Sequence, residues 1–144
     1  MKILLINGSP KGKGSNSLKL AYSFLEGFKD GCARKGEDLS IEELHVASMK
    51  IGACKGCFAC WKKTPGICCI KDDMQAVIEK QLEADLILWS FPLYYFNVPG
   101  ILKNLIDRQL PMSLPFMSAR QNGCGSGSHD ARYDMEGKRH VLIS

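Results

Sequence analysis

The chain has 144 residues, of which 45% are hydrophobic, and its formal net charge is +4 from 19 basic and 15 acidic side chains. This length suits one domain, spanning residues 1–144, with an ordinary buried core. The basic residues are scattered along the sequence, so we expect no nucleic-acid partner. No stretch is as long and apolar as a membrane span or the core of a signal peptide, which predicts a cytoplasmic protein with no membrane partner.

Strands and helices are expected to alternate along the chain. Short, continuous apolar runs suit buried parallel strands, whereas alternation of apolar and polar residues suits an edge strand with one wet face. Helices are predicted where apolar residues recur every three or four positions. The expected elements are strands at 2–6, 39–44 (the alternating edge strand), 85–90 and 140–143, and helices at 17–32, 72–83 and 99–109.

This alternation predicts an α/β fold in three layers, with a parallel sheet covered by helices on both faces. Two segments fall outside the pattern. One is a cysteine-rich loop at 48–71, and the other is a long loop or flap at 110–137 that contains several glycines and prolines.

A loop rich in glycine and serine follows the first predicted strand. Residues 7–17 read Asn-Gly-Ser-Pro-Lys-Gly-Lys-Gly-Ser-Asn-Ser and lead from a buried strand into a helix. Ligands of parallel sheets bind beyond the carboxyl ends of the strands, and a helix N-terminus offers free N–H groups to an anion. The loop lacks the dinucleotide fingerprint and the P-loop motif, and its polar side chains suit a terminal phosphate monoester. The alternative is a surface turn with a Ser or Asn helix cap.

A second loop, after the strand at 85–90, is rich in aromatic residues. It reads Ser-Phe-Pro-Leu-Tyr-Tyr-Phe-Asn over residues 90–97. Because its strand is expected beside the first strand, this loop is expected beside the first loop at the carboxyl edge of the sheet. Its aromatic side chains would border a planar ring there. The alternative is that they pack beneath the next helix.

The spacing of the cysteines points to a metal or redox role. The chain has seven, and in a reducing compartment structural disulfides are not expected. The candidate ligands are Cys54, Cys57, Cys60 and Cys68, and their compact spacing favours a [4Fe–4S] cluster over zinc. Cys69 leaves the fourth ligand open. Reduced cysteines that bind no metal are the remaining alternative.

These motifs are similar to those of a known family. The stretch from Met1 to Asp107 resembles the NAD(P)H-dependent FMN reductase and iron–sulfur flavoprotein group of flavodoxin-like proteins. The resemblance rests on Asn-Gly-Ser-Pro-Lys with Ser-Asn-Ser (7–17), on Cys-x-x-Cys-x-x-Cys with Cys-x-Ile-Lys-Asp-Asp-Met (54–74), and on Ser-Phe-Pro-Leu-Tyr-Tyr with Pro-Gly-x-Leu-Lys-Asn-Leu-Ile-Asp-Arg (90–108).

The resemblance implies FMN as cofactor and NAD(P)H as electron donor. It assigns the FMN phosphate to Ser9, Lys11, Ser15, Asn16 and Ser17. It places the ribityl chain and the ring against Pro92, Leu93, Tyr94, Tyr95 and Phe96. In the iron–sulfur flavoproteins, the matching cysteine region carries a cluster that passes electrons to FMN.

The function that the resemblance implies is electron transfer from NAD(P)H through FMN to a quinone, a flavin or another small-molecule acceptor. The first alternative is an iron–sulfur flavoprotein acting in electron transfer, and the second is a truncated, non-catalytic flavodoxin-like domain. The resemblance also implies the sheet order 2-1-3-4 without the family's fifth strand, a chain truncated at its C-terminus, and a homodimer or higher homo-oligomer. No catalytic acid or base is predicted. Asp107 and Arg108 are expected to make a structural ion pair or an interface contact.

Overall fold

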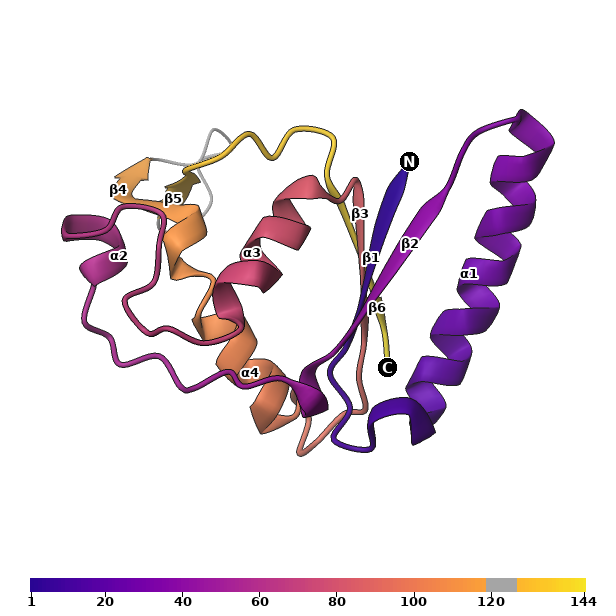
Figure 1. Ribbon diagram of the computed structural model, residues 1–144, viewed down its shortest axis with the longest axis horizontal. Coiled ribbons are helices and arrows are strands. Elements are labelled where there is room, and N and C mark those ends of the chain that lie inside the picture. The colour runs from indigo at the N-terminus through magenta and orange to yellow at the C-terminus, as the bar shows by residue number, and fades with distance from the viewer. Residues whose placement is uncertain (119–126) are drawn as a thin grey trace.

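A parallel sheet forms the centre of the computed structural model, which describes residues 1–118 and 127–144 (Figure 1). Its strand order is β2-β1-β3-β6, and every neighbouring pair is parallel. The strands are β1 (Lys2–Asn7), β2 (Ser40–His45), β3 (Leu86–Ser90) and β6 (Arg139–Ile143). The predicted α/β class and sheet order are confirmed, with β6 as the strand expected at 140–143 and β2 at one edge.

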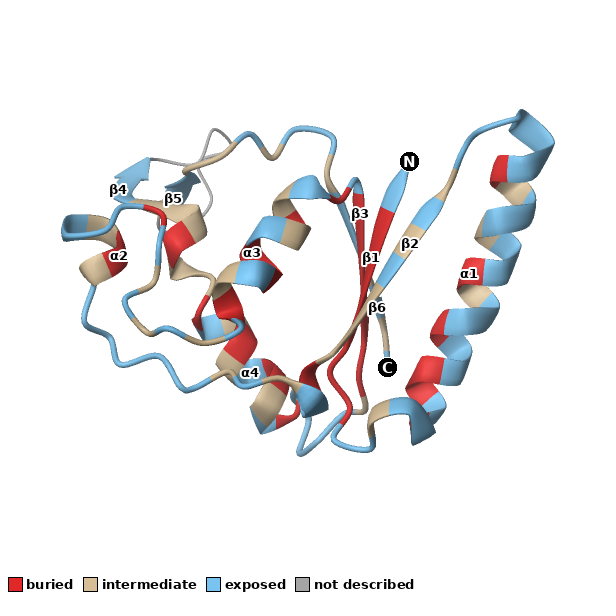
Figure 2. Ribbon diagram, viewed as in Figure 1, coloured by how far each residue is buried: buried red, intermediate tan, exposed pale blue. Residues whose placement is uncertain are grey.

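Helices cover both faces of this sheet, as expected. The helix α1 lies on one face, and α3 and α4 lie on the other (Figure 1). Their bounds are α1 (Asn16–Lys35), α3 (Met74–Glu83) and α4 (Gly100–Asp107). Because side chains alternate along a strand, Ile3 and Leu5 pack with the residues of α1, whereas Leu4 and Ile6 pack with those of α3 and α4. Figure 2 shows the buried residues concentrated on β1 and β3.

The helix α1 runs beyond its predicted end at Cys32. It ends where Gly36 adopts a left-handed conformation, with φ of +68°, and donates its N–H to the last turn. A glycine in this conformation is a common helix terminator because it lacks a Cβ that would clash. Gly31 inside the helix therefore did not stop it.

The prediction that 110–137 is a loop or flap is wrong for part of that segment. It holds β4 (Ser113–Ser118) and β5 (Ser128–Ala131), which pair antiparallel in a second, two-stranded sheet. Both strands are largely exposed, so the sequence shows no pattern of buried apolar residues that would predict them. Residues 119–126 of the segment lie outside the described residues. The remaining short helices are α2 (Ala59–Lys62), within the cysteine-rich loop, and the 3-10 turns η1 (Gly12–Gly14), η2 (Val46–Ser48) and η3 (Leu110–Met112).

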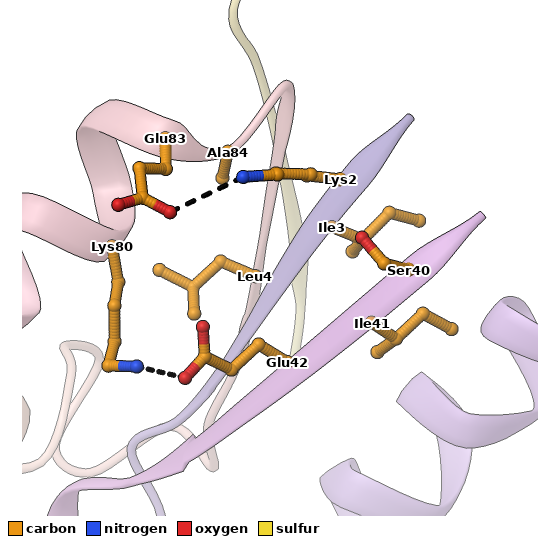
Figure 3. Close-up of a pocket in the computed structure, with 9 residues that line it drawn as sticks. All are labelled: Lys2, Ile3, Leu4, Ser40, Ile41, Glu42, Lys80, Glu83 and Ala84. Carbon is orange, nitrogen blue, oxygen red and sulfur yellow. Dashed lines mark hydrogen bonds and ion pairs between the residues drawn. The ribbon is translucent and has the colours of Figure 1, made fainter. Parts of the chain in front are cut away.

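A cavity of about 190 Å³ lies at the amino ends of β1 and β2, against α3 (Figure 3). Two ion pairs flank it, Lys2 with Glu83 and Lys80 with Glu42. Both pairs are partly exposed, and such pairs contribute little to stability. Ligands of parallel sheets bind at the opposite, carboxyl edge, so this cavity is not the candidate site.

Within residues 1–118 and 127–144, no helix combines the length and the apolar character needed to cross a bilayer.

Gly8 allows the end of β1 to pass close to α4. A Cβ at this position would lie 2.4 Å from Cδ2 of Leu102, a side chain that is fully buried. The N–H of Gly8 donates to the carbonyl of Ser90 at 2.8 Å, which ties the loop after β1 to the end of β3.

We predict that Gly8→Ala lowers the free energy of unfolding by about 1–3 kcal/mol, because the added methyl would lie within 3.0 Å of Cβ, Cγ and Cδ2 of the fully buried Leu102. Urea denaturation would measure the change. The control is Gly27→Ala in α1, where nothing lies within 4 Å of the added methyl. That change should stabilise the helix by up to about 1 kcal/mol. Equal free energies for Gly8→Ala and the parent would contradict the close approach.

Candidate functional site

The loop after β1 combines buried hydroxyls with exposed polar side chains. The hydroxyl-bearing residues Ser9, Ser15 and Ser17 are buried, whereas Lys11 and Asn16 are exposed. All five predicted phosphate-binding residues thus lie in one short loop and the first turn of α1, at the lower edge of the sheet in Figure 1.

The N-terminus of α1 has no side-chain cap. Ser15 occupies the N-cap position, but its hydroxyl lies 2.8 Å from that of Ser17 instead of accepting from the first turn. The first N–H groups of a helix lack partners within the helix and carry a partial positive charge. An anion is the natural partner for such a terminus. The Ser-capped surface turn considered from the sequence is therefore not formed by Ser15.

Asn7 organises this loop, a role that the sequence analysis missed. Its amide nitrogen donates to the carbonyl of Gly12 at 2.8 Å and to Nδ1 of His45 at 3.0 Å, and its amide oxygen accepts from the N–H of Ser9 at 3.1 Å. Since Nδ1 of His45 accepts, the proton lies on Nε2, which is 3.0 Å from Glu43. In the sequence, the available signal was an asparagine directly after a continuous apolar strand, and the structure shows that this side chain is fully buried.

A cavity of about 260 Å³ opens beside the loop. Lys11, Lys13 and His45 contribute to its wall, together with the backbone around Gly12. The lining is basic and includes no acidic side chain, so the cavity favours a negatively charged group.

The loop after β3 presents two aromatic side chains in a tight turn. Tyr94 and Asn97 exchange backbone hydrogen bonds of 2.8 and 3.1 Å, and the residues between them, Tyr95 and Phe96, both have positive φ. Glycine or asparagine normally fills such positions, because a side chain there costs conformational energy. Tyr95 is 97% exposed and Phe96 95% exposed. Packing under the next helix, the alternative drawn from the sequence, is therefore excluded for these two residues.

Of the other residues predicted for this loop, Leu93 and Tyr94 are exposed and Pro92 is half-buried. Ser90, where β3 ends, is fully buried, and its hydroxyl has no hydrogen-bond partner. Ser90 pairs with Asn7 across the sheet. The two loops therefore meet at one edge, with an unsatisfied hydroxyl between them.

The cysteines gather around a second, apolar pocket. The five residues Cys54, Cys57, Cys60, Cys68 and Cys69 all line it, alongside Lys55, Phe58, Ile70, Leu110, Pro111 and the buried Arg108. Phe58 has a left-handed backbone, with φ of +52°, which bends the chain between Cys57 and Cys60. The pocket encloses only about 20 Å³, and within the described chain no three metal-binding side chains are close enough to hold an ion.

The surroundings of Cys57 and Cys60 shift the pKa values of these two thiols in opposite directions. Burial, followed by the nearby Cys68, Cys57 and Cys54, raises the pKa of Cys60. The N–H of Ala59 and then Cys69 lower the pKa of Cys57, whose Sγ is 3.5 Å from that of Cys69. The charges of Cys68, Cys57 and Cys54 therefore act on Cys60, and Cys57 also contacts Cys69.

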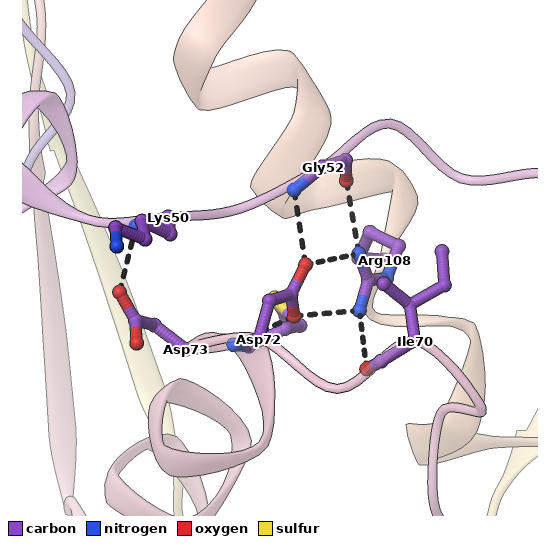
Figure 4. A network of polar contacts seen from close by, with 7 residues as sticks. Lys50, Gly52, Ile70, Asp72, Asp73 and Arg108 are labelled. Carbon is purple, nitrogen blue, oxygen red and sulfur yellow. Dashed lines mark hydrogen bonds and ion pairs between the residues drawn. The ribbon is translucent and has the colours of Figure 1, made fainter.

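Arg108 and Asp72 close the cysteine-rich loop with a buried ion pair (Figure 4). Two nitrogens of Arg108 donate to the two carboxylate oxygens of Asp72 at 2.8 and 2.9 Å. Burial alone would raise the pKa of Asp72, but hydrogen bonds from Arg108 and from the backbone of Gly52 and Met74 hold it below its usual value. Asp107 and Arg108 each make a structural ion pair but not with each other, because Asp107 pairs with Lys103 and Arg108 with Asp72.

Comparison with known proteins assigns the chain to a family. The family model for NADPH-dependent FMN reductase matches residues 1–121. The chain belongs to this family. It is 44% identical to an iron–sulfur flavoprotein of Archaeoglobus fulgidus over 108 residues, which are 75% of this chain and 48% of the relative.

One further relative and one solved structure are similar to the chain. An FMN-dependent NADH:quinone oxidoreductase 1 of Pseudomonas fluorescens is 30% identical over 152 residues, covering 99% of this chain and 67% of the relative. An FMN-dependent NADH-azoreductase from Bacillus anthracis, solved with FMN, shares the fold at a TM-score of 0.63, with 19% identity over 98% of this chain and 66% of its own. The chain spans about half the length of several curated relatives that it matches, the iron–sulfur flavoproteins.

We predict that Asp72→Ala lowers the free energy of unfolding by about 3–5 kcal/mol, because it leaves the buried guanidinium without a counter-charge. The stabilisation is present above the unfolded-state pKa of about 4 and is lost as the pH falls through the lower folded-state value. Urea denaturation at neutral and acidic pH would measure both effects.

The matched control is Asp107→Ala, which breaks the exposed pair with Lys103. Exposed pairs contribute about 1 kcal/mol or less. Equal losses in the free energy of unfolding for the two alanine variants at neutral pH would contradict the larger contribution expected of the buried pair.

Proposed function

We propose that this domain binds FMN and uses it to pass electrons from NAD(P)H to a small-molecule acceptor such as a quinone or a flavin. The observation that carries the proposal is the meeting of two features at one sheet edge: the uncapped N-terminus of α1 with its buried serines, and the exposed aromatic turn at 94–97. The membership of the FMN reductase family and the names of the relatives support it.

The residues present suit the parts of FMN. Ser9, Lys11, Ser15, Asn16 and Ser17 would hold the phosphate, with Asn7 keeping the loop in shape. The unsatisfied hydroxyl of Ser90 would gain a partner from a bound ligand. Pro92, Leu93, Tyr94, Tyr95 and Phe96 would border the ribityl chain and the ring. Two strained, exposed aromatic residues are costly unless a ligand or partner covers them.

The cofactor supplies the redox chemistry, since a bound flavin accepts hydride from a nicotinamide and returns electrons to an acceptor. The protein's part is to hold the phosphate, to place the ring at the exposed aromatic turn and to leave one face open to both substrates. No side chain at this edge is assigned as an acid or base.

We predict that changing Asn16 and Ser17 together to Ala weakens FMN binding by about tenfold or more, because hydrogen bonds to a charged phosphate are lost. Quenching of flavin fluorescence on titration would measure the affinity.

Ser23→Ala is the matched control, because Ser23 lies on the same helix and its hydroxyl donates only to the carbonyl of Lys19. It should bind FMN as the parent does. Unchanged affinity in the double variant, with its fold intact by circular dichroism, would refute the phosphate site.

We also propose an iron–sulfur cluster in the cysteine pocket, with Cys54, Cys57, Cys60 and Cys68 as ligands. The donor set supports this proposal, since four thiolates in an apolar enclosure suit a [4Fe–4S] cluster. The relative at 44% identity is named an iron–sulfur flavoprotein. Because about 20 Å³ leaves room for little more than one water molecule, the pocket must widen and the thiols must rearrange to admit a cluster.

We predict that Cys68→Ser abolishes iron loading in anaerobically reconstituted protein, whereas Cys69→Ser retains it. The reason is that the charge of Cys68 raises the pKa of Cys60, whereas the contact of Cys69 is with Cys57, 3.5 Å away between sulfur atoms. An iron assay on both variants, with Cys57→Ser as a second ligand variant, would measure this. Iron retained by Cys68→Ser and lost from Cys69→Ser would reverse the assignment of the fourth ligand.

We further propose that the chain assembles as a homodimer or higher homo-oligomer in the cytoplasm. The exposed strand β6, at one edge of the sheet with Leu142 67% exposed, supports assembly. The free cysteines among the described residues support a reducing compartment.

A further inference from the structure

Arg108 joins three separate parts of the cysteine-rich segment. Besides Asp72, its terminal nitrogens donate to the carbonyl of Gly52 at 2.9 Å and to that of Ile70 at 3.4 Å (Figure 4). Gly52 precedes the first cysteine of the pocket and Ile70 follows the last. The guanidinium therefore holds both ends of the loop while it remains 1% exposed.

One donor of this guanidinium is unused. The Nε atom is buried and has no hydrogen-bond partner among the described residues, although the other two nitrogens each make two hydrogen bonds. A buried N–H without a partner costs free energy, so it needs an explanation. Arg108 lines the cysteine pocket with Cys68, and its side chain lies within reach of the Cys68 thiol. Burial lowers the pKa of Arg108, but the hydrogen bonds and charges of Asp72 and then of Cys68 raise it above its usual value.

We propose that Arg108 raises the reduction potential of the iron–sulfur cluster in the cysteine pocket, through its positive charge and through a hydrogen bond from Nε to a sulfur atom. This inference rests on the cluster proposed above. Reduction adds one electron to the cluster, with no bond formed or broken, so the cluster becomes more negative. A buried cation and a hydrogen bond to sulfur both stabilise the reduced form more than the oxidised form.

The bidentate contact with Asp72 has two consequences for this role. It fixes the plane of the guanidinium, and with it the direction of the Nε–H bond, and its negative charge offsets part of the positive charge. The negative charge of Asp72 does not cancel the effect of a hydrogen bond from Nε, because an ionised carboxylate only accepts hydrogen bonds and cannot donate one to a sulfur atom. Arg108 is thus a positioning residue for electron transfer, acting on the cluster and not on the flavin.

A purely structural role for Arg108 would give a different pattern. If the residue only clamped the ends of the loop, replacing it would reduce how much iron the protein holds. The clusters that did form would keep the potential of the parent. The midpoint potential therefore separates the two roles, and it does not depend on enzyme activity.

The test compares the midpoint potential of the cluster in the parent, Arg108→Gln, Arg108→Lys and Lys103→Gln, each loaded with iron anaerobically and titrated with redox dyes. Arg108→Gln removes the charge and Nε. Arg108→Lys keeps the charge and can still pair with Asp72, but it has no group in place of Nε. Lys103→Gln removes a positive charge from the same helix at an exposed site, where solvent screens it.

We expect a lower potential in both Arg108 variants, with the larger shift in Arg108→Gln, and no shift in Lys103→Gln. If Arg108→Gln does not fold, a lower potential in Arg108→Lys alone supports the proposal. Iron-loaded Arg108→Lys with the potential of the parent would overturn it. Loss of iron from both variants in folded protein would also overturn it and leave Arg108 as a clamp. A parent chain that binds no iron would instead overturn the proposed cluster.

Discussion

The hydrogen bond between the N–H of Gly8 and the carbonyl of Ser90 fixes the relation between the two loops on which the candidate flavin site depends. It forms where the two buried central strands end side by side, and it requires the close approach of Gly8 to Leu102. The serine loop follows Gly8 along the chain, and the aromatic turn follows Ser90. Loops set on buried parallel strands are held by the core beneath them.

The helix α4 connects the two candidate sites. Leu102, in its first turn, packs against the loop after β1, and Arg108, just past its last residue, reaches into the cysteine pocket. Six residues of helix separate them by about 9 Å along the axis. A rigid helix of this length holds the candidate flavin site and the cysteine pocket at a fixed separation. A substitution at Arg108 therefore alters the cysteine pocket directly and leaves the contact between Leu102 and the loop after β1 in place.

Much of the fold was predictable because it follows from local patterns. Continuous apolar runs marked β1 and β3, alternation marked β2, and the position of both loops followed from the order of the strands. The missed features depend on contacts distant in sequence or on unusual backbone. Asn7 bonds to His45 across the sheet, and Asp72 meets Arg108 from 36 residues away. The positive φ of Tyr95 and Phe96 contradicts local preference, and β4 and β5 are too exposed to show a pattern.

The most direct test of the proposed function is the flavin and iron content of the anaerobically purified chain, read from its visible spectrum and an iron assay on one sample after adding FMN. The two proposals together predict flavin equimolar with the chain and about four iron atoms per chain, the number in a cubane cluster. Flavin without iron would retain the site at the sheet edge and refute the cluster. A colourless protein that does not retain FMN would contradict the central claim, that the serine loop and the aromatic turn together form a flavin site.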